Sequence, residues 1–170
     1  SYIAFVNLVG GQDELVFDGQ SLLLGPAGTV LARAKQFEEE ILFVDVPGEA
    51  GPLADPLPDL DEVYGALVLG LRDYVEKNGF GHVGLGISGG IDSALVAMLA
   101  VDALGPERVT LVVMPSPHSS AETQEDARQI ARNLGTELIE IAIEPMMAGY
   151  GEALDVHLRP EGEDAGASPT

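Results

Sequence analysis

The chain has 170 residues, of which 46% are hydrophobic, and this is enough for one globular domain or for parts of two. Its 28 acidic and 8 basic residues give a formal net charge of −20, which excludes a nucleic-acid partner because such a partner needs a basic face. The sequence has no cysteine, and this excludes disulfides, thiolate nucleophiles and cysteine metal sites. No signal peptide or membrane-length apolar run is apparent, so we expect a soluble, cytoplasmic protein with no membrane partner.

The first 46 residues have the pattern of extended structure. YIAFVNLVGG is one apolar run, and SLLLG and TVLARA flank a Pro-Ala-Gly turn, which predicts a hairpin. EEEILFVDV at residues 38–46 predicts a further strand. Residues 47–58, PGEAGPLADPLP, contain four prolines, and because proline disfavours helix and removes backbone donors we predict a linker there.

After the linker the apolar period changes to three and four residues, which predicts a long helix. We expect Asp59 or Asp61 to cap this helix and Asn78-Gly79 to end it. The residues predicted to form its apolar face are Leu60, Val63, Tyr64, Leu67, Val68, Leu71, Tyr74 and Val75.

The rest of the chain alternates short apolar strands with helices. Strands are predicted at 82–87, 108–114 and 137–143, with helices at 91–104 and around EDARQIARNLG. This alternation predicts an α/β fold with a parallel, doubly wound, Rossmann-like sheet. We expect Met146-Met147 to pack in the core or in a lid, and the tail from Gly149 onward to end in a flexible loop.

GISGGIDS, residues 86–93, lies where the first predicted parallel strand meets its helix. Its paired glycines allow a sharp turn, and the start of the next helix offers unpaired N–H groups to an anion. It is not a Walker A loop, because the nearest lysine, Lys77, precedes the strand. Asp92 beside a phosphate is costly unless a divalent cation lies between them, so we interpret the loop as a polyphosphate site and Asp92 as a Mg²⁺ ligand.

S-G-G-I-D-S after a strand resembles the nucleotide loop of the N-type ATP pyrophosphatases. SGGIDSALVAMLAVDALGPERV, VVMPSPHSS, EDARQIARNLG and IAIEPM are similar to NAD⁺ synthetases, whereas NLVGGQDELVFDGQS and FEEEILFVDV are similar to the end of a nitrilase-type glutamine amidase. The pairing resembles the glutamine-dependent NAD⁺ synthetases. It implies an internal fragment, with the C-terminal part of a nitrilase-type α+β amidase at 1–46, a linker at 47–58, and the N-terminal part of an adenine nucleotide α-hydrolase-like synthetase domain at 59–170.

The resemblance implies an enzyme that uses ATP and Mg²⁺ to amidate nicotinic acid adenine dinucleotide through an acyl adenylate. Its products would be NAD⁺, AMP and pyrophosphate, with ammonia supplied from glutamine and a homo-oligomer in the complete enzyme. No catalytic side chain is assigned in this segment, and Asp92 is the implied Mg²⁺ ligand. The implied ATP-binding residues are Gly86, Ile87, Ser88, Gly89, Gly90, Ile91, Asp92, Ser93, Val113, Met114 and Ser116.

Two features keep other functions open. Pro117 and His118 stand where the family usually carries a basic and then an aromatic residue, so a non-catalytic ATP-binding α/β module is one alternative. GMP synthetase shares the loop class, but its glutaminase has a different fold and GGQDELVFDG speaks against it. A tRNA-modifying relative is disfavoured by the net charge.

Overall fold

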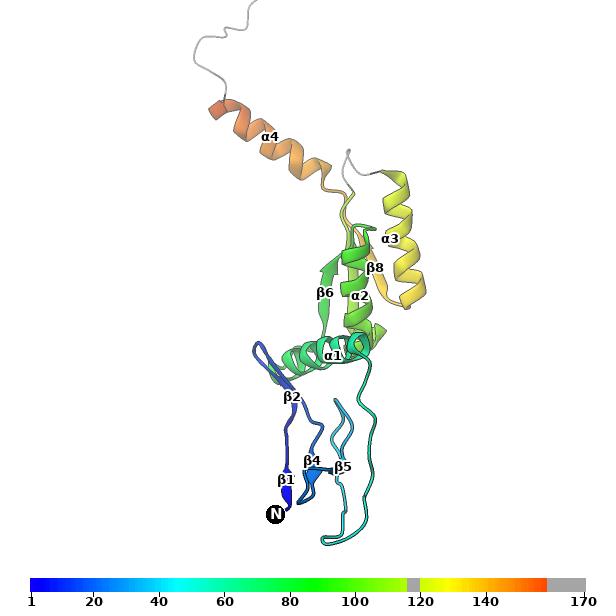
Figure 1. Ribbon diagram of the computed structural model, residues 1–170. Helices are drawn as coiled ribbons and strands as arrows, with labels where there is room; N and C mark the ends of the chain where they lie inside the picture. Colours follow the sequence, from blue (N-terminus) through cyan, green and yellow to red (C-terminus); the bar gives the residue numbers. More distant parts are fainter. Residues whose placement is uncertain (116–119, 159–170) are drawn as a thin grey trace, which may run out of the picture.

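The computed structural model describes residues 1–115 and 120–158, and the side chains up to residue 154. Figure 1 shows small antiparallel strands at one end, helix α1 across the middle, and a parallel sheet with its helices beyond it. The predicted α/β fold is confirmed. Within the described residues, no helix is both long and apolar enough to cross a membrane.

The N-terminal strands form two small antiparallel sheets, which we call the N-terminal β unit. The predicted hairpin is confirmed, since β4 pairs with β5 and the turn closes with Gly28 N–H donating to Gly25 O at 2.9 Å. The single apolar run at the N-terminus instead makes two separate strands, which pair with different partners. The strands are β1 (Ile3–Phe5), β2 (Val9–Gln12), β3 (Leu15–Asp18), β4 (Leu22–Leu24) and β5 (Val30–Arg33).

The strand predicted at residues 38–46 is wrong. These residues form no strand, and Ile41 and Phe43 are exposed. Strand propensity describes a fit to a pleated, half-buried surface, and it produces a strand only where a partner supplies the ladder. No described strand pairs with this segment, so it lacks the neighbouring strand that would complete its backbone hydrogen bonds.

Helix α1 (Asp59–Lys77) ends at Asn78 as predicted, but its start and its buried face differ from the prediction. Its N-cap is Pro58, while Asp59 and Asp61 lie in the first turn, where carboxylates favour the helix dipole. The prediction holds for Val75, which is buried, and for Val68 and Leu71, which pack against the core. Leu69 is buried although it was not predicted, and four residues of the predicted face are exposed. These four are Leu60, Val63, Leu67 and Tyr74.

The parallel sheet has the order β6-β7-β8, with β7 in the middle. Its strands are β6 (Val83–Gly86), β7 (Val109–Val113) and β8 (Glu137–Glu140). Helices α2 (Ile91–Leu104) and α3 (Ala121–Leu134) follow β6 and β7. Their alanines pack close to Leu111 and Val109 of β7, which are fully buried. Small side chains let the helices approach the sheet, and the core sits there.

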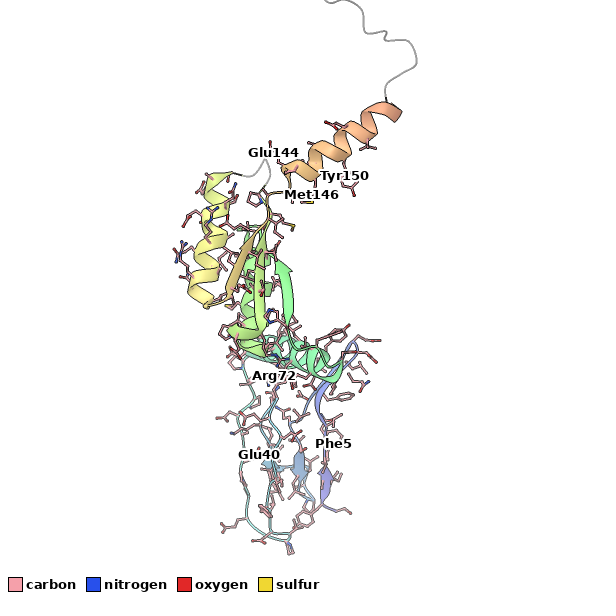
Figure 2. All side chains as sticks on the ribbon, turned by 180° about the vertical axis from the view of Figure 1, so that it is seen from behind. Phe5, Glu40, Arg72, Glu144, Met146 and Tyr150 are labelled. Carbon is pink, nitrogen blue, oxygen red and sulfur yellow. The ribbon has the colours of Figure 1, made fainter. Side chains whose placement is uncertain are left out.

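Helix α4 (Glu144–Leu158) contains the first part of the tail that begins at Gly149, and the predicted loop at the end of that tail lies outside the described residues. Helix α4 points away from the rest of the molecule, and Figure 2 shows Met146 and Tyr150 on it. Met146 and Met147 are exposed, so of the two predicted settings, core or lid, packing in the core is wrong. A Cβ added at Gly149 or Gly151 would meet no atom within 4 Å, so close packing does not require glycine at either position.

A hydrogen bond that joins helices α1 and α2 raises the pKa of one tyrosine. Tyr64 Oη donates to Asp102 Oδ2 at 2.6 Å, and this bond, with burial and the carboxylate charge, raises the pKa of Tyr64 to about 12. An unfolded tyrosine titrates near pH ~10, so the bond contributes stability fully below that pH and loses it as the pH rises through about 12.

Among the four tyrosines, we therefore expect one phenolate absorbance step near pH 12. Tyr64→Phe removes this step, and the control Tyr74→Phe retains it. Spectrophotometric titration measures both variants. A late step that persists in Tyr64→Phe contradicts the assignment.

Candidate nucleotide site

The site begins at the carboxyl end of β6, where ligands bind in open α/β sheets. Ile87 is buried, and its N–H donates to Val112 O at 2.9 Å, so the loop leaves the sheet from a fixed point. The three strands run in chain order, so the described sheet has no reversal of strand order. The site is therefore placed by the ends of β6 and β7 alone.

Two serines hold the loop in shape. Ser88 Oγ and Ser93 Oγ are 3.0 Å apart, and Ser93 Oγ donates to Gly90 O at 3.0 Å. A hydroxyl carries one proton, so Ser88 is the donor in the serine–serine contact. The N–H of Gly90 donates to Ser88 Oγ at 3.2 Å, and the N–H of Ser88 donates to Ser93 Oγ at 3.2 Å. Both hydroxyl protons serve the loop itself in this geometry.

Gly89 fits against the first turn of α3. Its φ is +85°, and a Cβ built there would lie 2.1 Å from Thr123 O, a backbone atom. Ser120 caps α3 by accepting from Thr123 N–H at 3.1 Å, so the backbone that faces Gly89 is held in place. Only glycine meets both conditions at this position.

The start of α2 is free of side-chain caps. Gly90 is the N-cap, and as a glycine it supplies no side-chain acceptor to the first-turn N–H groups. Asp92 lies in this first turn and is exposed, as is Ile91. The helix start offers partial positive charge, and an exposed carboxylate lies beside it.

A cavity of about 370 Å³ opens between the loop and the end of β7. It lies in the size range of small-molecule sites. It is lined by Gly86, Ile87, Ser88, Ser93, Val113, Met114, Pro115 and Gln124.

Six of the eleven predicted residues line this cavity, and four others lie beside it. Gly89, Gly90, Ile91 and Asp92 belong to the adjoining turn and first helical turn. Ser116, like Pro117 and His118, lies outside the described residues. Sequence reasoning missed Pro115, although it lies between the predicted residues Met114 and Ser116. It also missed Gln124, for which the available signal was its place in the first turns of a capped helix.

The described residues that line the cavity include no lysine or arginine. Arg128 lies on the helix that supplies Gln124, but it makes two bonds to Glu140, at 2.7 and 2.9 Å. This bonding raises the pKa of Arg128 and lowers the pKa of Glu140. Among the described lining residues, an anionic ligand would therefore meet backbone N–H groups and the helix start, and no cationic side chain.

Two family models match the chain. The sequence model of the NAD synthase family matches residues 63–165, more than half of the chain. The chain belongs to the NAD synthase family. The carbon-nitrogen hydrolase model matches residues 1–55, the segment that contains the N-terminal β unit.

Relatives of this NAD synthase chain are much longer than the chain. The glutamine-dependent NAD(+) synthetase of Aquifex aeolicus is 45% identical over 88% of this chain and 33% of its own length. That of Synechocystis is 43% identical over 89% of this chain and 28% of its own length. The chain therefore spans about a third of the curated relatives it matches.

Solved NAD synthase structures show the same arrangement. A glutamine-dependent NAD⁺ synthetase from Acinetobacter baumannii, in complex with ADP, has a TM-score of 0.88 and 38% identity over 96% of this chain and 32% of its own. An NH₃-dependent NAD synthetase from Campylobacter jejuni, in complex with nitrate, has a TM-score of 0.53 and 31% identity over 57% of this chain and 42% of its own.

Proposed function

We propose that this chain is part of an ATP- and Mg²⁺-dependent enzyme that amidates nicotinic acid adenine dinucleotide to NAD⁺. The carboxylate of the dinucleotide attacks the α-phosphate of ATP, pyrophosphate leaves, and ammonia from glutamine displaces AMP from the acyl adenylate. The observation that carries the proposal is the cavity at the ends of β6 and β7, which is bordered by GISGGIDS and an uncapped helix start in a chain of the NAD synthase family.

The residues divide into three proposed roles. The N–H groups of the loop and of the first turn of α2 receive the phosphates, since a helix start is a ready anion site. Val113 and Met114, at the end of β7, border the adenine side of the cavity, and Ser116 is proposed to do the same. Ser88 and Ser93 maintain the loop that aims these groups.

Asp92 is the residue that would hold Mg²⁺. The described residues contain no group of three or more His, Cys, Asp or Glu that could enclose a metal ion. This fits Mg²⁺, which is usually held by one or two carboxylates together with water and substrate phosphates. When bound, the ion would neutralise the negative charges of the Asp92 carboxylate and the phosphates. The described cavity lining has no cationic side chain that could do this.

We also propose domain boundaries for the chain, and a cellular location and an oligomeric state for the complete enzyme. Residues 1–46 would be the end of a nitrilase-type amidase domain, 47–58 a linker, and 59–170 the start of the synthetase domain. The carbon-nitrogen hydrolase and NAD synthase matches support two units. An enzyme that consumes ATP is expected in the cytoplasm, and we propose a homo-oligomer for the complete enzyme.

A second candidate is a module that binds ATP without turning it over. The lack of lysine and arginine among the described lining residues favours it, because a leaving pyrophosphate requires charge compensation. The two candidates differ in their need for a divalent cation. The enzyme needs Mg²⁺ for turnover, whereas the module catalyses no acyl-phosphate chemistry for which Mg²⁺ would be required.

The decisive assay is pyrophosphate release from ATP and Mg²⁺, with the dinucleotide and added ammonia each present or omitted. Ammonia is added directly because the chain has no cysteine for a thiol amidase. Release that needs the dinucleotide is the expected result for the synthetase. ATP binding without release is the result expected of the module and equally of a segment that lacks the rest of the synthetase, and it leaves the loop assignment standing. Failure to bind ATP at any Mg²⁺ concentration contradicts both candidates.

A further inference from the structure

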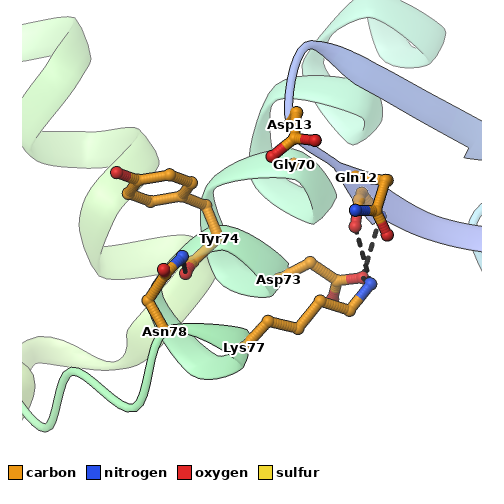
Figure 3. Close-up of a pocket in the computed structure, with 8 residues that line it drawn as sticks. Gln12, Asp13, Gly70, Asp73, Tyr74, Lys77 and Asn78 are labelled. Atoms are coloured by element: carbon orange, nitrogen blue, oxygen red, sulfur yellow. Dashed lines mark hydrogen bonds and ion pairs between the residues drawn. The ribbon is translucent and has the colours of Figure 1, made fainter.

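Gly11, in strand β2, is bonded to helix α1 through both of its backbone polar groups. Its N–H donates to Asp73 Oδ2 at 2.8 Å, and its carbonyl accepts from Lys77 Nζ at 2.6 Å (Figure 3). Asp73 and Lys77 are four residues apart, so they lie one above the other on the same helix face. The acid and the amine give Gly11 the acceptor and the donor that a neighbouring strand would give.

The backbones of strand and helix also meet closely at this point. A Cβ at Gly11 would lie 3.0 Å from the Cα of Gly70 on α1, and a Cβ at Gly10 would lie 2.9 Å from Asp73 Oδ2. The approach at Gly10 is closer than real Cβ contacts but faces the end of a side chain, whereas the approach at Gly11 faces backbone and is tighter than nine in ten real Cβ contacts. The two glycines of β2 and the glycine of α1 therefore bring the acid and the amine within reach of the strand.

The ion pair at this contact is only partly exposed to solvent. Lys77 Nζ lies 2.9 Å from Asp73 Oδ2, and the Asp73 side chain is 21% exposed against 56% for Lys77. Burial pushes the pKa of Asp73 upward, but the bonds from Lys77 and from the Gly11 N–H, with the charges of Lys77 and Arg72, lower it overall. Removing Lys77 leaves the partly buried Asp73 carboxylate with the Gly11 N–H but without its cation, which costs more than the loss of a fully exposed ion pair.

Helix α1 is also hydrogen-bonded to helix α2. Arg72, next to Asp73 on α1, donates from Nε to Ala103 O at 3.1 Å. Helix α1 therefore bonds to the β2–β3 hairpin on one side and to the helix that begins the candidate nucleotide site on the other. The hairpin lies in the carbon-nitrogen hydrolase match and α1 lies mostly in the NAD synthase match.

We propose that Asp73 and Lys77 form a clamp, which we call the Gly11 clamp, that joins the N-terminal β unit to α1 in one cooperative folding unit. The clamp is the hydrogen-bonded part of the contact between the hydrolase-type segment and α1, beside the packing of Phe37 on Gly65 and of Val16 on Gly70. It does not depend on the proposed reaction. With the clamp intact, the β2–β3 hairpin opens only when α1 opens.

Hydrogen exchange on the 170-residue chain tests the clamp through Lys77→Met and Asp73→Ala. We expect amide protection in the β2–β3 hairpin to fall by about tenfold or more in each variant, and protection in β7 to stay unchanged. Lys77→Met retains the aliphatic stem, so it keeps the fold even if Asp73→Ala does not. Lys77→Arg retains a charged donor and is expected to restore most of the protection.

The matched control is Lys35→Met, which removes a lysine from an exposed ion pair with Glu38 at 2.9 Å in the same N-terminal segment. This control is expected to leave hairpin protection unchanged. Hairpin protection that stays at the wild-type level in Lys77→Met overturns the proposal. A fall of equal size in the hairpin and in β7 overturns it as well, since the two parts would then remain coupled without the clamp.

Discussion

Gly89→Ala is expected to lower the free energy of unfolding by about 2–4 kcal/mol and to abolish ATP binding at the loop. The added Cβ would lie 2.1 Å from Thr123 O, and the residue would keep a φ of +85° that alanine rarely adopts. Because the facing atom is backbone in a capped helix turn, the loop has to move. Urea unfolding and calorimetric titration with ATP measure the two effects.

Substitutions at two other glycines separate the contribution of backbone strain from that of the steric clash at Gly89. Gly79 has a φ of +73° and no atom within 4 Å of a built Cβ, so Gly79→Ala adds backbone strain alone and is expected to cost about 1 kcal/mol. Gly81 has neither condition, and Gly81→Ala is expected to change stability by less than about 0.5 kcal/mol. A Gly89→Ala protein as stable as Gly81→Ala would show that the loop does not pack on α3 as described.

Asp92→Asn is expected to remove most of the effect of Mg²⁺ on ATP affinity. Two ligands that share a site are commonly coupled by about 5- to 150-fold in affinity, and Asp92 is the carboxylate proposed to hold the cation. Asparagine retains the shape but loses the charge. Titration with ATP at several Mg²⁺ concentrations measures the coupling in both proteins.

The control for this prediction is Asp102→Asn, which removes a charge from the same helix at its other end. It is expected to leave the Mg²⁺ coupling intact. Asp92→Asn is also expected to change stability by no more than about 1 kcal/mol, because an exposed acid in a first helical turn contributes only a dipole interaction. Full Mg²⁺ coupling in Asp92→Asn would exclude Asp92 as the ligand and leave the loop assignment to be tested by Gly89→Ala.

Much of the site could be read from local sequence because its parts are local. The tight turn, the small residues and the helix start all lie within GISGGIDS, and each follows from its neighbours in the chain. Gln124 could not be found in the same way. Its place beside the loop depends on how α3 docks on the sheet, and a short-range pattern carries no information about that distance.

The function of the two serines also depended on the folded loop. As isolated residues, Ser88 and Ser93 are hydroxyl donors that could serve a phosphate. In the structure they bond to each other and to Gly90, and these bonds shape the loop. The separation of 3.0 Å between the two hydroxyls depends on the fold of the loop and is not specified by the spacing of five residues, while the contact of these serines with ATP stays a prediction.

The sequence by itself determined the parallel α/β sheet, its helices and the nucleotide-type loop, because apolar period, glycine turns and helix ends are set by residues close together in the chain. Tertiary structure decided which side of α1 is buried, since that helix turns Gly70 and Asp73 toward β2 and leaves Leu60 exposed. It also decided that residues 38–46 form no strand. A buried helix face and a strand both need a partner from elsewhere in the chain. A local sequence pattern does not show which distant segment supplies that partner.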